Sequence, residues 1–273
     1  MLDTVHIEEA SYEGNERVLA EWFCQLNINS LKKRKELGLD RILVWVGDQL
    51  TVSRLWGLKK LLCEDLNSFE RLEFLKQIFG WFHAEIAFEH SIHSQYYGTQ
   101  AGHGLVHAFD LLQWKGLHSP SVQGEFHHNL QEGLYHIAHV CLRDLWCTVA
   151  GVQSLASLRD FNPKQLLALA TKIQADFAST HALNQMYHKT EKEKDAVLTQ
   201  AIMWNWDILD YIVLDNVIKN GDVGCIRALL PHMLFRFVGG TNSKYAIEIL
   251  ELIQGLEKEW PHDLRYACHT WWL

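Results

Sequence analysis

The sequence has little proline and no long apolar run. Only four of its 273 residues are proline, and because proline ends or kinks helices, so low a content favours long, uninterrupted helices. No apolar run approaches the roughly 20 residues that a membrane-spanning helix needs. The acidic, polar start of the chain, MLDTVHIEEASYEGNE, lacks the apolar segment of a signal peptide. We therefore expect an intracellular protein of the cytoplasm or nucleus that is not secreted and has no membrane partner.

The motifs of several enzyme classes are also missing. The sequence has no phosphate-binding loop, no Gly-x-Gly-x-x-Gly fingerprint and no Gly-x-Ser-x-Gly elbow, so it indicates no nucleotide or organic cofactor and no serine hydrolase. Its six cysteines include no Cys-x-x-Cys pair and are expected to be reduced, buried and structural. The formal net charge of −8 argues against a large nucleic-acid-binding surface, although a small local one stays open.

What the sequence does have is apolar residues at helical spacing. Hydrophobic residues make up 48% of the chain and eleven residues are tryptophan, which is enough for a full core. The spacing predicts a mainly α protein with helices over about 15–36, 50–62, 69–77, 84–97, 103–115, 125–149, 163–179, 194–219 and 222–235, and a last one that ends near 256. We expect one domain over residues 1–273, frayed over 1–13, with the one plausible hinge near 186–194.

Two short apolar runs break this helical pattern. Residues 41–47 are rich in β-branched and aromatic side chains and are too short for a helix, so they predict a strand that is buried on both faces, as parallel strands usually are. A second run predicts a strand near 78–83, followed by a helix. The expected fold class is therefore mainly α, with a small buried parallel β element packed in a large helical domain.

A polar residue ends each predicted strand. Asp48 follows the first and His83 ends the second, and the carboxyl ends of neighbouring strands are where open α/β sheets bind their ligands. An aspartate there can hold Mg²⁺, because hard cations select carboxylate oxygens. Glu248, on the last predicted helix, is a candidate second acid. An N-cap role for Asp48 at the helix that follows explains its position equally well, and both interpretations stay open.

The sixteen histidines suggest an alternative metal site. Residues four apart lie on one face of a helix, so Glu89 with His93, and Glu132 with His136 and His139, are a candidate carboxylate–histidine set for iron, zinc or copper. None of these spacings matches a specific metal motif, and this many histidines produce such pairs by chance. The simpler interpretation, which the sequence favours, is that they lie on helix surfaces or are hydrogen-bonded in the core.

Several stretches resemble a known family. The similarity covers roughly residues 40 to 260, and it is carried by WVGDQLTVSRLWGLKK, CEDLNSFERLEFL, GWFHAEIAFEHSIHSQYYGT, GHGLVHAFDLL, FHHNLQEGLYHI, WNWDILDYIVLDNVIKNGD and RFVGGTNSKYAIEILELIQGL. They resemble an uncharacterised domain that is expanded in mushroom-forming (basidiomycete) fungi and looks transposon-derived. This resemblance implies transposase-like or nuclease-like ancestry.

The resemblance also implies roles for particular residues. In a remote ribonuclease-H-like α/β core, Asp48 would be the first metal-binding acid and Glu248 the acid borne on a helix, together holding Mg²⁺ or Mn²⁺. His83 stands where such a core usually has an aspartate, as a third ligand or a proton-transfer group. The residues between Asp48 and His83 read as helices rather than the hairpin that such a core needs. These departures imply a shortened, domesticated or inactive relative.

Three functions therefore stay open at this point. The leading hypothesis is a transposon-derived, metal-dependent nuclease-like or transposase-like domain, active or inactive, whose partner is a nucleic acid. The first alternative is a non-catalytic helical scaffold that binds a protein partner or associates with itself. The second alternative is a carboxylate–histidine metalloprotein. Whether the chain is an enzyme is not decided by its sequence.

Overall fold

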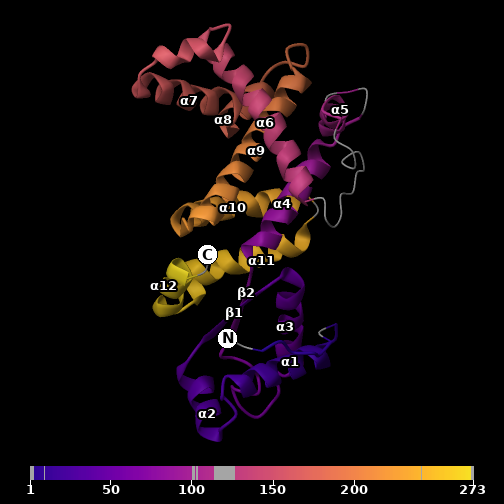
Figure 1. Cartoon of the computed structure of the whole chain (residues 1–273), viewed down its shortest axis with the longest axis vertical. Helices are drawn as coiled ribbons and strands as arrows, with labels where there is room; N and C mark the ends of the chain where they lie inside the picture. The colour runs from indigo at the N-terminus through magenta and orange to yellow at the C-terminus, as the bar shows by residue number, and fades with distance from the viewer. Residues whose placement is uncertain are drawn as a thin grey trace. The chain divides into compact units, whose positions relative to one another are not determined.

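The computed structural model describes residues 3–8, 10–99, 102, 104–113, 127–240 and 242–271. Over these residues the chain is mainly helical, with one sheet of two parallel strands, as the sequence predicts (Figure 1). The ends of two predicted helices, at 103, 114–115 and 125–126, lie outside the described residues.

The chain forms two compact units. Residues 1–84 and 243–273 make the first, here called the sheet unit, and residues 85–242 make the second, here called the helical unit. The sheet unit is therefore built from two separate stretches of sequence. The single domain predicted for residues 1–273, its frayed start and its hinge near 186–194 stay predictions, because compactness alone does not decide which parts fold independently.

The sheet unit carries both strands. Its elements are α1 (Tyr12–Gln25), α2 (Leu31–Asp40), β1 (Leu43–Gly47), α3 (Gln49–Leu61), β2 (Leu75–Phe79), the first turn of α4 (Trp81–Tyr96), α11 (Ser243–Gln254), a π-helical turn (Gly255–Glu259) and α12 (His262–Trp271). Side chains at the N-cap fix where the first three helices begin, because Ser11, Ser30 and Asp48 each accept a backbone N–H of the first turn.

The core of the sheet unit lies on one face of its sheet. Helices α1 and α3 pack there, and their buried residues form one apolar cluster with residues of α2, of the turn before β2 and of β2 itself. The cluster is Leu19, Phe23, Leu37, Leu55, Leu58, Leu72, Phe74 and Leu75. Strand β1 alternates, since Val44 and Val46 are 36% and 53% exposed. The prediction that the 41–47 run is buried on both faces is therefore wrong. A two-stranded sheet leaves one face of β1 uncovered, and the β-branched residues there do not indicate burial.

Three predicted boundaries differ from the structure. The helix expected over 15–36 is two helices, interrupted between α1 and α2. The helix expected over 69–77 does not form, since residues 68–74 are turns and β2 begins at Leu75. The strand expected near 78–83 therefore lies three to four residues earlier, at Leu75–Phe79, and His83 belongs to the first turn of α4. Pairing of β2 with β1 satisfies the backbone and outweighs the local helical pattern.

The helical unit contains the rest of α4, then α5 (Leu105–Leu111), α6 (His127–Ala150), a 3-10 helix (Leu155–Asp160), α7 (Pro163–Phe177), α8 (Thr180–Tyr187), α9 (Ala196–Asn220) and α10 (Val223–Gly239). Its clearest boundaries follow from capping. Asn162 forms a capping box before Pro163, and Gly221 ends α9 with φ of 69°. Helix α10 continues through Pro231.

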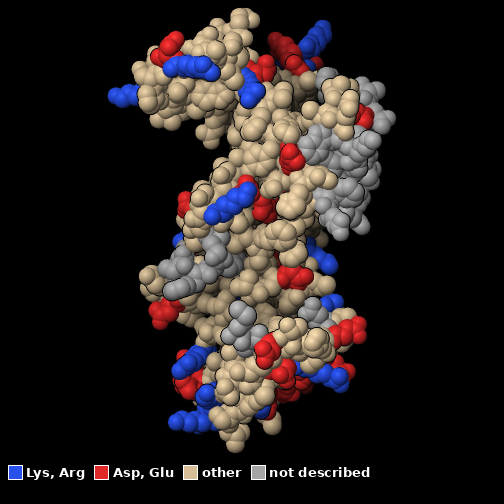
Figure 2. Space-filling model, viewed as in Figure 1, with Lys and Arg blue, Asp and Glu red and all other residues tan. Residues whose placement is uncertain are grey.

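Charged side chains of both signs share the face drawn in Figure 2, and the cysteines are unpaired. On the face that Figure 2 shows, lysine and arginine are mixed with aspartate and glutamate over the described residues. All six cysteines are free thiols; Cys24 and Cys63 are exposed and Cys268 is buried, so the expectation of burial is wrong for the first two. Within the described residues, no helix is both long and apolar enough to cross a membrane.

Candidate functional site

The predicted residues Asp48 and His83 lie at the same edge of the sheet. Asp48 follows β1 directly, and the backbone N–H of Gly80, just after β2, donates to the carbonyl of Gly47 at 2.7 Å. This bond holds the start of α4, and with it His83, beside the end of β1. Asp48 is partly buried and His83 is exposed. The prediction that parallel strand ends bring these residues together is supported, although His83 stands on a helix rather than at a strand end.

Asp48 caps α3 and carries a negative charge. Its Oδ1 accepts the backbone N–H of Thr51 at 2.7 Å, so the N-cap interpretation is confirmed. Burial alone would raise the pKa of Asp48, but the hydrogen bonds from Thr51 and the charges of protonated His83 and of Arg54 outweigh it and lower the pKa below its ordinary value. The electrostatic influence of His83 shows that the two side chains are close. Capping uses one carboxylate oxygen, so it does not exclude a second role.

Glu248 reaches the same neighbourhood from α11. It is 7% exposed, and burial raises its pKa to about 7, although a hydrogen bond from Gln49, the residue after Asp48, opposes this rise. Tyr245, one turn earlier on α11, is near both acids, since burial and then the charges of Asp48 and Glu248 raise its pKa to about 12. Thus α11, which lies far along the sequence, packs against α3 and β2 and brings the third predicted residue to this edge.

Glu248 also lines a small cavity. Its volume is about 20 Å³, room for about one water molecule, and it is lined in part by Gln77, Glu248 and Trp260. The side-chain amide of Gln77 is 5% exposed and finds no hydrogen-bond partner among the described residues, and neither does Nε1 of Trp260. Buried polar groups of this kind are normally satisfied by an ordered water.

A model of one protein family matches residues 1–273, the whole chain; it is described as a family of unknown function, DUF6589. The chain belongs to this family. No curated protein and no solved structure matches the chain. Membership in DUF6589 carries no activity with it, so the chemistry of the chain has to be argued from its own residues.

The residues at the sheet edge suit a hard divalent cation in part. Mg²⁺ is usually held by one or two carboxylates, with water and substrate phosphates completing its shell, and Asp48 and Glu248 are ligands of that kind. Within the described ranges, no group of three or more His, Cys, Asp or Glu is placed to hold a metal ion. A cation at this edge of the DUF6589 chain would therefore need oxygen atoms from its substrate, in contrast to a closed structural site.

The alternative metal set is not brought together. In the helical unit, Glu89 and His93 on α4 are fully buried, whereas Glu132, His136 and His139 on α6 are exposed. His93 packs against the ring of Phe109, with 6.1 Å between ring centroids. The residues of α6 that meet α4 are instead His127 and Gln131, one turn earlier.

Sequence reasoning missed a buried acidic network in the helical unit. Glu85 and Glu89 on α4 and Asp215 on α9 are 7%, 0% and 3% exposed. Hydrogen bonds from α6 and α9 join them, through Gln131, Tyr135, Tyr211 and His127. Burial is the largest cause that raises the pKa of Glu85 to about 7 and of Glu89 to about 8. A signal was present in the sequence, because Glu85 and Glu89, and likewise Tyr211 and Asp215, are polar residues four positions apart within strongly apolar helices.

A second buried network stands beside the first. Asp207 on α9 is 1% exposed, and its Oδ2 accepts a hydrogen bond from the hydroxyl of Tyr96 at 2.6 Å. It also forms an ion pair with Arg236 on α10. Burial raises its pKa to about 6, while Arg236 and Tyr96 oppose the rise. The hydrogen bond from Tyr96 and the ion pair with Arg236 thus link α4, α9 and α10.

Proposed function

We propose that the chain is a transposon-derived, metal-dependent nuclease-like protein whose centre is Asp48, His83 and Glu248. The observation that supports the proposal is that these three residues, separated by up to 200 positions in sequence, belong to one compact unit, in which His83 acts on the pKa of Asp48 and both acids act on the pKa of Tyr245. The resemblance to domains of mushroom-forming fungi supports the transposon-derived part. The nucleic acid is the partner that such a site would take.

The roles of the three residues follow from their environments. Asp48 is charged and half-exposed, so it would hold Mg²⁺ or Mn²⁺ together with Glu248, which would release its proton to do so. When bound, the cation would neutralise charge on a phosphodiester and activate water. His83 is exposed beside Asp48, so its imidazole can bind a phosphate oxygen or move a proton to the leaving oxygen. Two parallel strands with a helical insertion before α11 would be a shortened ribonuclease-H-like core.

Asp48→Asn tests this proposal without disturbing the fold. Asparagine caps a helix as well as aspartate does, so this variant removes the charge and keeps the bond to Thr51. We expect Mg²⁺ or Mn²⁺ binding, measured by calorimetry in the presence of a short oligonucleotide, to fall at least tenfold. Asp40→Asn, an exposed acid at the end of α2, is the matched control and should bind as the unaltered protein does. Equal affinity in all three proteins would overturn the proposal.

Cleavage of a labelled DNA duplex then distinguishes an active from an inactive descendant. Metal-dependent cleavage that is lost in Asp48→Asn and Glu248→Gln indicates a working nuclease. Metal binding that depends on Asp48, without cleavage of single-stranded or double-stranded DNA, indicates a centre that retains its ligands and has lost its reaction.

A helical scaffold without catalysis is the second candidate. Phe235 and Val238, three residues apart on one face of α10, are 75% and 65% exposed, and exposed apolar surface of this kind often marks an interaction site. The scaffold predicts that light scattering of the purified chain gives a dimer or larger species, which Phe235→Ser with Val238→Ser converts to monomer. No Asp48-dependent metal binding together with this conversion would favour the scaffold over the nuclease.

A further inference from the structure

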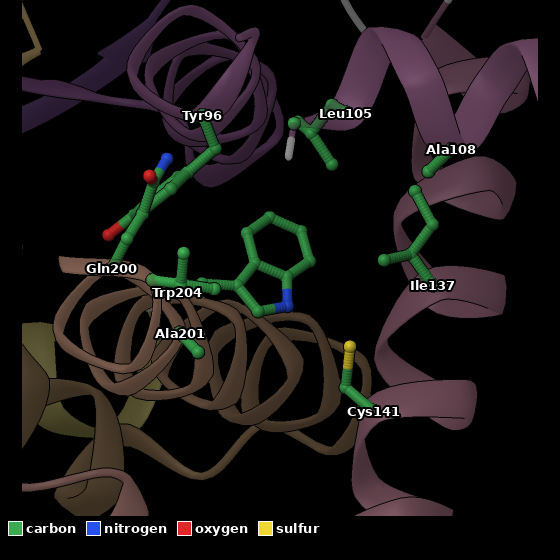
Figure 3. A pocket seen from close by; sticks show the side chains of 10 residues that line it. Tyr96, Leu105, Ala108, Ile137, Cys141, Gln200, Ala201 and Trp204 are labelled. Carbon is green, nitrogen blue, oxygen red and sulfur yellow. The ribbon is translucent and has the colours of Figure 1, made fainter. Parts of the chain in front are cut away.

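A cavity of about 250 Å³ that opens to the surface lies in the helical unit, apart from the proposed centre. Helices α4, α5, α6 and α9 surround it (Figure 3). Its wall is mainly apolar, although Gln200 also lines it, and the side chains that matter here are Tyr96, Leu105, Ala108, Ile137, Cys141 and Trp204. None of the described residues that line it is Asp, Glu, Lys or Arg. A charged molecule would lose its hydration there without gaining a partner.

One polar group in this wall lacks a partner. Trp204 is only 7% exposed, and its Nε1 has no hydrogen-bond acceptor. Figure 3 shows its indole ring projecting into the space between α9 and α6, with Nε1 on the side of Ile137 and Cys141. The sulfur of Cys141 is close enough to Trp204 for the indole to lower the pKa of the thiol, but the two groups do not have the geometry of a hydrogen bond. Burial outweighs this effect and raises the pKa of Cys141, so the thiol stays neutral. A buried donor without an acceptor is unfavourable and rare.

The cavity is held open by its walls. The hydroxyl of Tyr96 is fixed by its bond to Asp207 at 2.6 Å, and the Tyr96 ring meets Trp204 edge to face, with 5.3 Å between centroids. Neither ring is free to collapse into the space. Ala108 on α5 and Ala201 on α9, which also line the cavity, have short side chains. The volume is therefore left between fixed aromatic rings and short residues.

From this geometry we infer that the cavity binds a small neutral molecule, of one or two rings, that accepts a hydrogen bond from Nε1 of Trp204. An apolar cavity of roughly 150 Å³ holds benzene, so about 250 Å³ suits a bicyclic ring system. One acceptor atom on an otherwise apolar body satisfies the indole N–H and leaves no polar group of the ligand unpaired. The ligand class is thus a neutral aromatic heterocycle or ketone.

Two probes of equal shape test the inference. Quinoline has one ring nitrogen that accepts a hydrogen bond, and naphthalene has none. Ligand-observed NMR titrations of the full chain should show quinoline binding about five- to tenfold more tightly than naphthalene, the effect of one hydrogen bond. In Trp204→Phe, which keeps an aromatic ring but has no N–H, the two affinities should become equal. Trp22→Phe, in the sheet unit, is the control and should keep the preference.

A second measurement does not depend on any Trp204 variant folding. Quinoline should slow the alkylation of Cys141 by N-ethylmaleimide at least threefold, as followed by peptide mass spectrometry, while exposed Cys63 reacts at an unchanged rate. Ala201→Phe, which fills the cavity, should abolish the binding of both probes. The inference is overturned if neither probe binds, if quinoline and naphthalene bind the unaltered protein equally, or if Cys141 gains no protection.

Discussion

The hydroxyl of Tyr211 donates a hydrogen bond to Oε1 of Glu89 in the interior of the helical unit, and neither residue is exposed. The other carboxyl oxygen, Oε2, lies 2.7 Å from Nδ1 of His127. Burial raises the pKa of Glu89 to about 8 and lowers that of His127. At neutral pH the Glu89 carboxyl is therefore protonated and donates to a neutral imidazole. The interaction is a chain of neutral hydrogen bonds rather than a salt bridge.

This arrangement predicts that the helical unit loses stability as pH rises. The pKa of Glu89 is about 8 in the folded chain, against an ordinary value of 4.5, so between these values the folded state holds a proton that the unfolded state has released. The contribution of the Glu89 carboxyl to the free energy of unfolding is fully present below pH 4.5 and is lost by about pH 8. Between these values the free energy of unfolding falls by up to about 1.4 kcal/mol per pH unit. Glu85, with a pKa of about 7, adds to this loss. Urea denaturation from pH 5 to 8 measures it.

Glu89→Gln is the control for that measurement. An amide can accept from Tyr211 and donate to His127 as the protonated acid does, and it does not titrate. We expect this variant to be about as stable as the unaltered protein at pH 5 and more stable at pH 8. A pH dependence that is the same in both proteins would show that Glu89 is not the group responsible.

Arg236→Ala should strongly destabilise the helical unit. It leaves the carboxylate of Asp207, 1% exposed, without its cation, and breaking a buried pair from one side costs about 3–5 kcal/mol. Thermal unfolding of Lys219→Ala gives the comparison. Lys219 pairs with buried Asp215, but its own side chain is 63% exposed and Tyr135 also donates to Asp215, so that loss should stay below about 1 kcal/mol. Equal losses would contradict the importance of burial here.

Capping by Asp48 has a stability effect that is separate from any metal. Asp48→Ala removes the acceptor for the Thr51 N–H and should lower the free energy of unfolding by about 1 kcal/mol. Asp48→Asn should change it by only a few tenths of that amount. Chemical denaturation in the presence of a chelator measures both variants without cation. A large loss in the asparagine variant would mean that the charge, rather than the cap, stabilises the fold.

Two neighbouring glycines at the end of α10 should respond in opposite ways to alanine. A Cβ at Gly240 would collide with Oγ of Ser91, which is buried and bonded to Asn242, so Gly240→Ala should cost about 1–3 kcal/mol. A Cβ at Gly239 meets no atom within 4 Å, and alanine has the higher helix propensity, so Gly239→Ala should be neutral or up to about 1 kcal/mol more stable. Denaturant midpoints of the two variants give the comparison directly.

The sequence predicts the helices well where an end signal accompanies the apolar spacing. Asn162 before Pro163, and Asn220 before Gly221, mark boundaries that the structure reproduces closely. Strand β2 could not be located in this way. Its sequence LKQIF continues a helical pattern, and only its pairing with β1, more than 25 residues away, makes it extended. Short strands whose partner decides their conformation escape local pattern reasoning.

The candidate site was predictable in its parts but not in its surroundings. Asp48 could be predicted as a candidate site residue because a polar residue directly after an apolar strand is a local signal. Its role as the N-cap of α3 could be predicted from the same position. The nearness of Glu248 depends on how α11 packs, which no local pattern contains. The network of Glu85, Glu89 and Asp215 was missed because helical spacing shows which face a residue shares, and not which residue of another helix it meets.

The division of the sheet unit into residues 1–84 and 243–273 has a consequence for the order of events during synthesis. The helical unit is one continuous stretch, so all of its residues have been translated once residue 242 has left the ribosome. The sheet unit has to wait for α11 to cover β2, so its apolar strand surface stays uncovered through the translation of 158 further residues. The sheet unit is thus completed after the helical unit has been made, and Asp48 and Glu248 first share a unit once α11 has been translated.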